Sequence, residues 1–120
     1  MQKKILYIDD DPDILEAVKI ILEGNDYVVK TASDLTSLKE IIFYNPNLIL
    51  LDILLNGKSG REVAMKIKST PQLENTPLII ISAHTLSKLK QIKTEWQANG
   101  FLQKPFDMDV LLTTIKYFLK

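Results

Sequence analysis

The sequence has no cysteine and only one histidine among its 120 residues. The absence of cysteine excludes a disulfide framework and a thiolate metal site. An excess of charge of one sign is also absent, because fifteen Lys and Arg residues balance fifteen Asp and Glu residues. This balance creates no net field that would attract nucleic acid or an anionic membrane, so we expect no direct binding to either.

Long hydrophobic runs are missing as well. No apolar run approaches the roughly 20 residues that span a bilayer. The N-terminal residues 1–4 lack the apolar core of a signal peptide, and we therefore expect a protein of the cytoplasm. With 46% apolar and 25% charged residues, the composition is typical of a soluble globular protein, and the length suits one domain over residues 1–120.

Short apolar runs alternate along the chain with segments whose apolar residues recur at helical spacing. The run at 48–51 has four large apolar residues in succession, which is typical of a strand buried on both faces of a parallel sheet. We expect Asp34 and Asp107 to cap the second and the last helix. The alternation predicts an α/β fold, a three-layer doubly wound (βα)5 domain with a five-stranded parallel sheet. Its strands are predicted at residues 4–8, 27–31, 48–51, 78–81 and 101–102.

Polar side chains follow four of these five strands. Asp9 and Asp10 come after the first strand, Asp52 after the third, Ser82 after the fourth and Lys104 after the fifth. Each residue alone could be a helix cap, a turn residue or a solvated surface group. The carboxyl ends of parallel strands lie along one edge of the sheet, where ligands bind in such folds. The set therefore predicts a single site at that edge.

The residue types of this site favour phosphoryl chemistry. Neighbouring carboxylates repel one another unless a cation joins them, and oxygen ligands suit a hard cation such as Mg²⁺. A lysine and a hydroxyl can stabilise the charge that develops on phosphoryl oxygens. A carboxylate that acts as nucleophile would become an aspartyl phosphate.

The ordered set of motifs resembles the receiver domain of bacterial two-component response regulators over the whole length of the chain. Gly60 matches the glycine that follows the phosphorylation loop of that family. The resemblance implies a flavodoxin-like fold with strand order 2-1-3-4-5. The residues that carry it are Asp9-Asp10, Asp52, Ser82-Ala83 and Lys104-Pro105-Phe106.

The resemblance also implies a function. Asp52 would accept a phosphoryl group from a phosphohistidine on a sensor histidine kinase or a histidine phosphotransfer protein. Asp10 would bind Mg²⁺ (or Mn²⁺) directly, and Asp9 would help either as a direct ligand or through contacts with the direct ligands. Asp52 itself and the backbone carbonyl of Leu54 would complete the protein ligands. Such a protein is a phosphoacceptor that catalyses its own phosphorylation and slow dephosphorylation, and is not an enzyme with a separate substrate.

Further residues would convert phosphorylation into a signal. Lys104 would pair with the phosphoryl oxygens, Ser82 would shift to bond them, and Phe101 would rotate inward behind Ser82. Family members keep the corresponding Lys-Pro peptide bond cis. The surface of the fourth helix, fifth strand and fifth helix would then change for a downstream protein or effector domain, and whether it also drives homodimerisation is open. Leu54 and His84 are expected to tune access of water and hence the phosphoryl lifetime.

The chain departs from the family pattern at Asn56, where many receivers have proline four residues after the phosphorylated aspartate. The dipeptide Asn56-Gly57 favours a tight turn with left-handed backbone. We therefore expect the loop at residues 53–59 to follow a different path beside the metal site.

Other functions compete with this interpretation. A degenerate receiver would act only as a phosphorylation-independent scaffold, but the complete set of site residues argues against it. A haloacid-dehalogenase-like phosphatase has a second aspartate two residues after the nucleophile, where this chain has Leu54. A nucleotide or flavin site lacks support because no glycine-rich phosphate-binding motif occurs. The sequence leaves open whether the chain is a single-domain regulator, a phosphorelay intermediate or a receiver cut from a longer protein.

Overall fold

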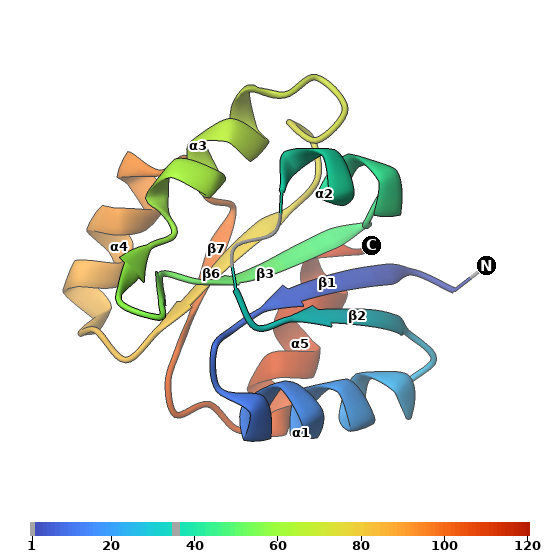
Figure 1. Cartoon of the computed structure of the whole chain (residues 1–120). Helices are drawn as coiled ribbons and strands as arrows, with labels where there is room; N and C mark the ends of the chain where they lie inside the picture. The colour runs from blue at the N-terminus through green and yellow to red at the C-terminus, as the bar shows by residue number, and fades with distance from the viewer. Residues whose placement is uncertain (1, 35–36) are drawn as a thin grey trace.

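The computed structural model describes residues 2–34 and 37–120, and its helices and strands alternate as the sequence predicts (Figure 1). The strands of the main sheet are β1 (Lys4–Ile8), β2 (Val28–Ala32), β3 (Leu48–Asp52), β6 (Leu78–Ser82) and β7 (Gly100–Gln103). The helices are α1 (Pro12–Glu23), α2 (Leu38–Tyr44), α3 (Arg61–Ser69), α4 (Leu86–Glu95) and α5 (Met108–Phe118). Two short strands, β4 (Leu54–Leu55) and β5 (Lys58–Ser59), form a separate hairpin.

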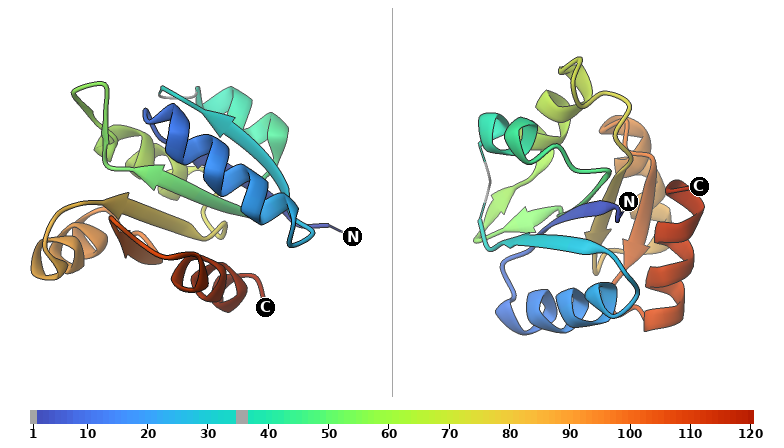
Figure 2. Two further views of the ribbon diagram at one scale, coloured as in Figure 1. Left: turned by 90° about the horizontal axis from the view of Figure 1, so that it is seen from below. Right: turned by 90° about the vertical axis from the view of Figure 1, so that its right-hand side faces the viewer.

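The main sheet is parallel throughout, in the order β2-β1-β3-β6-β7. This is the predicted order 2-1-3-4-5, because the strands of the hairpin are numbered between β3 and β6. Figure 2 shows the three layers, with α1 and α5 on one face of the sheet and α2, α3 and α4 on the other. The flavodoxin-like α/β architecture is confirmed. Among the described helices, none combines the length and the apolar character needed to cross a membrane.

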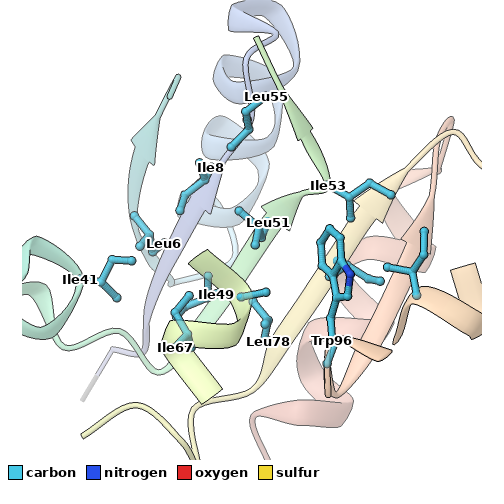
Figure 3. Close-up of a cluster of buried hydrophobic side chains, with 14 of the residues drawn as sticks. Leu6, Ile8, Ile41, Ile49, Leu51, Ile53, Leu55, Ile67, Leu78 and Trp96 are labelled. Carbon is cyan, nitrogen blue, oxygen red and sulfur yellow. The ribbon is translucent and has the colours of Figure 1, made fainter. Parts of the chain in front are cut away.

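Strict alternation along the central strands divides the core into two apolar layers. In β3, Leu48 and Leu50 pack toward α1 and α5, whereas Ile49 and Leu51 pack toward α2, α3 and α4. All four side chains are fully buried. Figure 3 shows the second layer, in which Trp96 lies at the end of α4. A strand covered on both faces has no polar position until it leaves the core, which is why the polar residues lie at the strand ends.

Two local predictions were wrong. Asp34 does not cap the second helix. Ser37 does, because its hydroxyl accepts a hydrogen bond from the backbone N–H of Glu40 at 3.2 Å, and α2 therefore begins at Leu38. Residues 53–59, predicted as a loop, contain the antiparallel hairpin β4–β5. The other predicted cap is confirmed, because the Asp107 side chain accepts from the backbone N–H of Val110.

Candidate functional site

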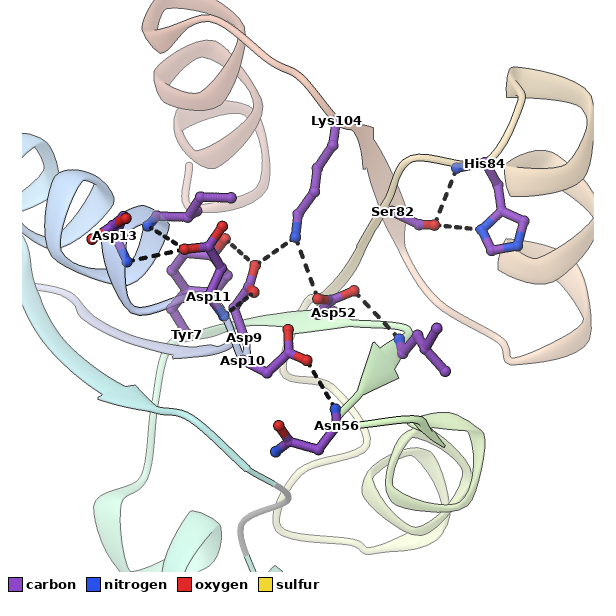
Figure 4. Close-up of polar contacts among 12 residues, drawn as sticks. Tyr7, Asp9, Asp10, Asp11, Asp13, Asp52, Asn56, Ser82, His84 and Lys104 are labelled. Carbon is purple, nitrogen blue, oxygen red and sulfur yellow. Dashed lines mark hydrogen bonds and ion pairs between the residues drawn. The ribbon is translucent and has the colours of Figure 1, made fainter.

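Most of the predicted site residues lie together at the carboxyl edge of the sheet, among them the three aspartates, Ser82, His84 and Lys104 (Figure 4). β1 pairs with β3 so that Ile8 lies beside Leu51, and Asp9 and Asp52 follow as neighbours. A cavity of about 510 Å³ opens at this edge. Its lining contains six of the predicted site residues, Asp10, Asp52, Leu54, Ser82, His84 and Lys104.

Three carboxylates form the acidic part of the site. One oxygen from each of Asp9, Asp10 and Asp52 lies within 4.8 Å of the other two. Asp9 has no exposed surface and Asp52 is only 6% exposed, whereas Asp10 is the most accessible of the three. Carboxylates at this separation repel one another, so the cluster favours a bound cation.

Lys104 supplies a fixed positive charge to this cluster. Its Nζ atom lies 2.9 Å from Oδ2 of Asp9 and 3.3 Å from Oδ2 of Asp52. The backbone N–H of Lys104 donates to the carbonyl oxygen of Ser82 at 2.8 Å, and the Lys104-Pro105 bond is cis, as the resemblance implied. Burial alone would lower the pKa of Lys104, but the two carboxylates outweigh burial and raise it. Lys104 therefore remains charged at neutral pH.

The pKa of Asp52 is raised above its ordinary value of 3.8. Burial is the largest cause, and the negative charge of Asp9 adds to it. Lys104 and a hydrogen bond from the backbone N–H of Leu54 to Oδ1 of Asp52 (3.3 Å) act in the opposite direction. The surroundings of Asp52 thus disfavour its charged form, although Lys104 and the backbone N–H of Leu54 stabilise that form in part.

Tyr7 is a member of the site that sequence analysis did not identify. Its hydroxyl donates to Oδ2 of Asp9 at 2.7 Å, within the buried layer under α1 and α5. Burial, together with the hydrogen bond and the charge of Asp9, raises the pKa of Tyr7, so the group stays protonated and donates. Tyr7 lies near the end of β1 and Asp9 directly after it, and their two-residue spacing directs both side chains to the same face of the sheet. That periodicity was the available signal in the sequence.

The three carboxylates differ in their hydrogen-bond partners and in whether they line the cavity. Asp9 accepts from the backbone N–H of Asp11 at Oδ1 and from Tyr7 and Lys104 at Oδ2. Asp10 accepts from the backbone N–H of Asn56 at Oδ2 (2.9 Å). Asp10 and Asp52 both line the cavity and are therefore the carboxylates best placed to hold a metal ion there. Asp9 is better placed to orient the lysine.

The hairpin beside the site has the predicted left-handed turn. Asn56 and Gly57 have φ angles of 50° and 78°, as a type I′ turn with the sequence Asn-Gly requires. A Cβ atom on Gly60 would lie 3.0 Å from the carbonyl oxygen of Asp52, so glycine lets α3 begin against the end of β3. The hairpin thereby places Leu54, which is 55% exposed, at the mouth of the cavity.

Ser82 and His84 lie at the end of β6 and in the loop that leads to α4, whereas Phe101 lies on β7. The hydroxyl of Ser82 contacts Nδ1 of His84 and accepts from the backbone N–H of His84 at 3.1 Å. Phe101 is half-buried on β7 and packs against the apolar layer that contains Trp96. It does not line the cavity at the strand ends.

Comparisons with known proteins agree with this architecture. The family model of the response regulator receiver domain matches residues 5–116. The chain is 37% identical over 115 residues to the nitrogen assimilation regulatory protein NtrX of Azorhizobium caulinodans, covering 93% of this chain and 25% of that protein. It is 30% identical over 118 residues to the response regulator ArlR of Staphylococcus saprophyticus, covering 98% of this chain and 52% of ArlR.

A third relative and a solved structure extend the likeness. The DNA-binding response regulator MtrA of Mycolicibacterium smegmatis is 27% identical over 124 residues, which cover 100% of this chain and 52% of MtrA. The chain thus spans about half, or less, of the length of each of these three relatives. The chemotaxis response regulator CheY4 of Vibrio cholerae superposes with a TM-score of 0.90 at 28% identity, covering 99% of this chain and 100% of CheY4.

Proposed function

This chain belongs to the response regulator receiver domain family, and from that membership we propose that Asp52 accepts a phosphoryl group in a two-component system or phosphorelay. One observation carries the proposal. The Asp52 carboxylate ends the central strand inside a cavity, within 3.3 Å of Lys104 and beside two further carboxylates. This set provides a nucleophile, a cationic partner and metal ligands within one pocket.

The proposed reaction moves one phosphoryl group. A carboxylate oxygen of Asp52 attacks the phosphorus of a phosphohistidine, the P–N bond breaks, and the released imidazole takes up a proton. The product is a mixed anhydride on Asp52. Water later attacks the same phosphorus, which releases inorganic phosphate and restores the carboxylate. Lys104, already 3.3 Å from Asp52, stays close enough to pair with the phosphoryl oxygens throughout.

The donor set of the acidic cluster fits Mg²⁺ or Mn²⁺. Asp10, Asp52 and the backbone carbonyl of Leu54 would hold the ion, because hard cations prefer oxygen ligands. When bound, the ion would neutralise charge on the phosphoryl oxygens. Asp9 would contact these ligands without facing the ion directly, because it has no exposed surface and does not line the cavity.

The signal would leave the site through Ser82 and Phe101. Ser82 ends β6 and precedes α4, so its displacement toward Asp52 would alter the loop that anchors this helix. The proposed partners are a sensor histidine kinase or a histidine phosphotransfer protein as donor, and a downstream protein or effector domain that reads the α4–β7–α5 surface in the cytoplasm. Homodimerisation on phosphorylation would use the same surface.

Intact mass spectrometry tests the proposal. The protein is incubated with acetyl phosphate and Mg²⁺, beside samples without Mg²⁺ and beside the Asp52→Asn variant. We expect one phosphoryl adduct on the wild type and none on either control. Lack of an adduct on the wild type, under conditions that label another receiver domain, would favour a phosphorylation-independent scaffold instead.

A further inference from the structure

The side chains of Ser82 and His84 form a polar pair at the rim of the cavity. Ser82 is 6% exposed, and its Oγ atom contacts both Nδ1 and the backbone N–H of His84. Figure 4 shows the hydroxyl directed toward the imidazole ring and not toward Asp52. Within the described part of the chain, His84 is the partner recorded for this buried hydroxyl.

Hydrogen bonds hold the backbone around this pair, whereas the exposed imidazole ring can move away from Ser82. The side-chain amide of Gln103 donates to the carbonyl oxygen of His84 at 3.0 Å, and the backbone N–H of Lys104 donates to the carbonyl oxygen of Ser82 at 2.8 Å. The His84 residue itself is exposed. The ring can therefore rotate into solvent without opening a cavity in the core.

The direction of the Ser82 side chain makes its two possible partners, the imidazole and a phosphoryl group, compete for the hydroxyl. A serine hydroxyl has one proton to donate, and a neutral imidazole nitrogen either accepts or donates according to its tautomer. Either tautomer of His84 keeps Oγ on the imidazole side. A phosphoryl group on Asp52 would be an anionic acceptor in the same cavity, and Ser82 would have to turn away from His84 to reach it.

We propose that His84 is a positioning residue that holds the Ser82 hydroxyl away from Asp52 until a phosphoryl group draws it inward. This inference rests on the proposed function of Asp52. The Ser82–His84 contact stabilises the unphosphorylated arrangement, so the protein must give it up when the phosphoryl group is bound. His84 thereby sets the balance between the two states of the Ser82 loop.

Binding of beryllofluoride with Mg²⁺, which mimics an aspartyl phosphate, tests the inference. His84→Ala removes the competing partner, and we expect it to bind beryllofluoride about two- to tenfold more tightly than the wild type, the range of one net hydrogen bond. His84→Asn retains a polar atom near the position of Nδ1 and should bind with wild-type affinity. In a Ser82→Ala background the His84→Ala substitution should have no effect, because the hydroxyl that His84 restrains is gone.

A spectroscopic signature complements these affinities. The ¹⁵N chemical shift of His84 Nδ1 should change when the wild type binds beryllofluoride, as its contact with Ser82 breaks. Equal affinity of wild type and His84→Ala, or an unchanged Nδ1 shift on binding, would overturn the role of His84 while leaving Asp52 as acceptor. Beryllofluoride binding that is absent in the wild type, or that persists in Asp52→Asn, would instead overturn the proposed function and this inference with it.

Discussion

The backbone N–H of Asn56 donates a 2.9 Å hydrogen bond to Oδ2 of Asp10, a residue 46 positions earlier in the chain. The turn of the hairpin therefore reaches the acidic cluster directly. Its geometry depends on left-handed backbone at Asn56 (φ 50°) and Gly57 (φ 78°). The departure from the family's usual proline is thus accommodated by a type I′ turn that contacts a candidate metal ligand.

Asn56→Pro should therefore damage both the hairpin and the acidic cluster. Proline fixes φ near −65° and removes the N–H that Asp10 accepts. We expect a loss of about 1–3 kcal/mol in the free energy of unfolding, measured by urea denaturation. Asn56→Gly keeps the positive φ and the N–H, and is the matched control with little change. A proline variant as stable as the control would contradict the assigned role of the turn.

Tyr7→Phe should destabilise the protein although it removes a single oxygen atom. The Tyr7 hydroxyl donates to the fully buried carboxylate of Asp9, and hydrogen bonds to charged groups contribute about 1.5–3 kcal/mol. Urea denaturation at pH 7 measures the loss. Tyr117→Phe makes the same chemical change at an exposed position and should alter stability by less than about 0.5 kcal/mol. Equal stabilities of the two variants would show that Lys104 and Asp11 satisfy Asp9 without Tyr7.

Neutralising Asp52 should stabilise the metal-free protein at neutral pH. Because the pKa of Asp52 is raised above 3.8 in the folded state, the folded protein binds this proton more tightly than the unfolded chain. The free energy of unfolding of the wild type therefore decreases as pH rises from 3.8 through the raised pKa of Asp52. Asp52→Asn has no titrating group at this position and should not show this decrease. Urea denaturation without Mg²⁺ should find the variant more stable than the wild type at pH 7, with the difference shrinking in acid. A wild type more stable than the variant at pH 7 would reverse the expected sign.

Mg²⁺ should stabilise the wild type through Asp10. A ligand at 100 times its Kd adds about 2.7 kcal/mol to the free energy of unfolding. We expect most of this gain to disappear in Asp10→Asn and to persist in Asp13→Asn, which changes an exposed acid in the first turn of α1. Urea denaturation with and without Mg²⁺ provides the comparison. An undiminished gain in Asp10→Asn would place the ion elsewhere.

The sequence was sufficient to predict features that depend on strand periodicity. Asp9 and Asp52 follow buried runs, and parallel pairing of β1 with β3 brings the two together whatever the details of the loops. The left-handed turn at Asn56-Gly57 was also predictable, because few dipeptides tolerate that backbone. The hairpin was missed because its strands are only two residues long and lie outside the main sheet.

Contacts that depend on tertiary placement could not be predicted in the same way. In the sequence, Tyr7 is one more residue of an apolar strand, and only the structure shows that its hydroxyl donates a hydrogen bond to Asp9. His84 was expected near the site, but its contact with Ser82 depends on the path of the β6–α4 loop, which Gln103 helps to fix. Ser37 caps α2 in place of Asp34, since both residue types are good caps and propensity does not separate them.

Locating the phosphoryl group on a residue tests the central claim most directly. The protein is phosphorylated with acetyl phosphate and Mg²⁺, reduced with borohydride, which converts an aspartyl phosphate to homoserine, and then digested for peptide sequencing by mass spectrometry. Our account predicts homoserine at position 52, with unmodified aspartate at positions 9 and 10. Homoserine at another aspartate, with position 52 unmodified, would contradict the assignment of Asp52 as the phosphoryl acceptor.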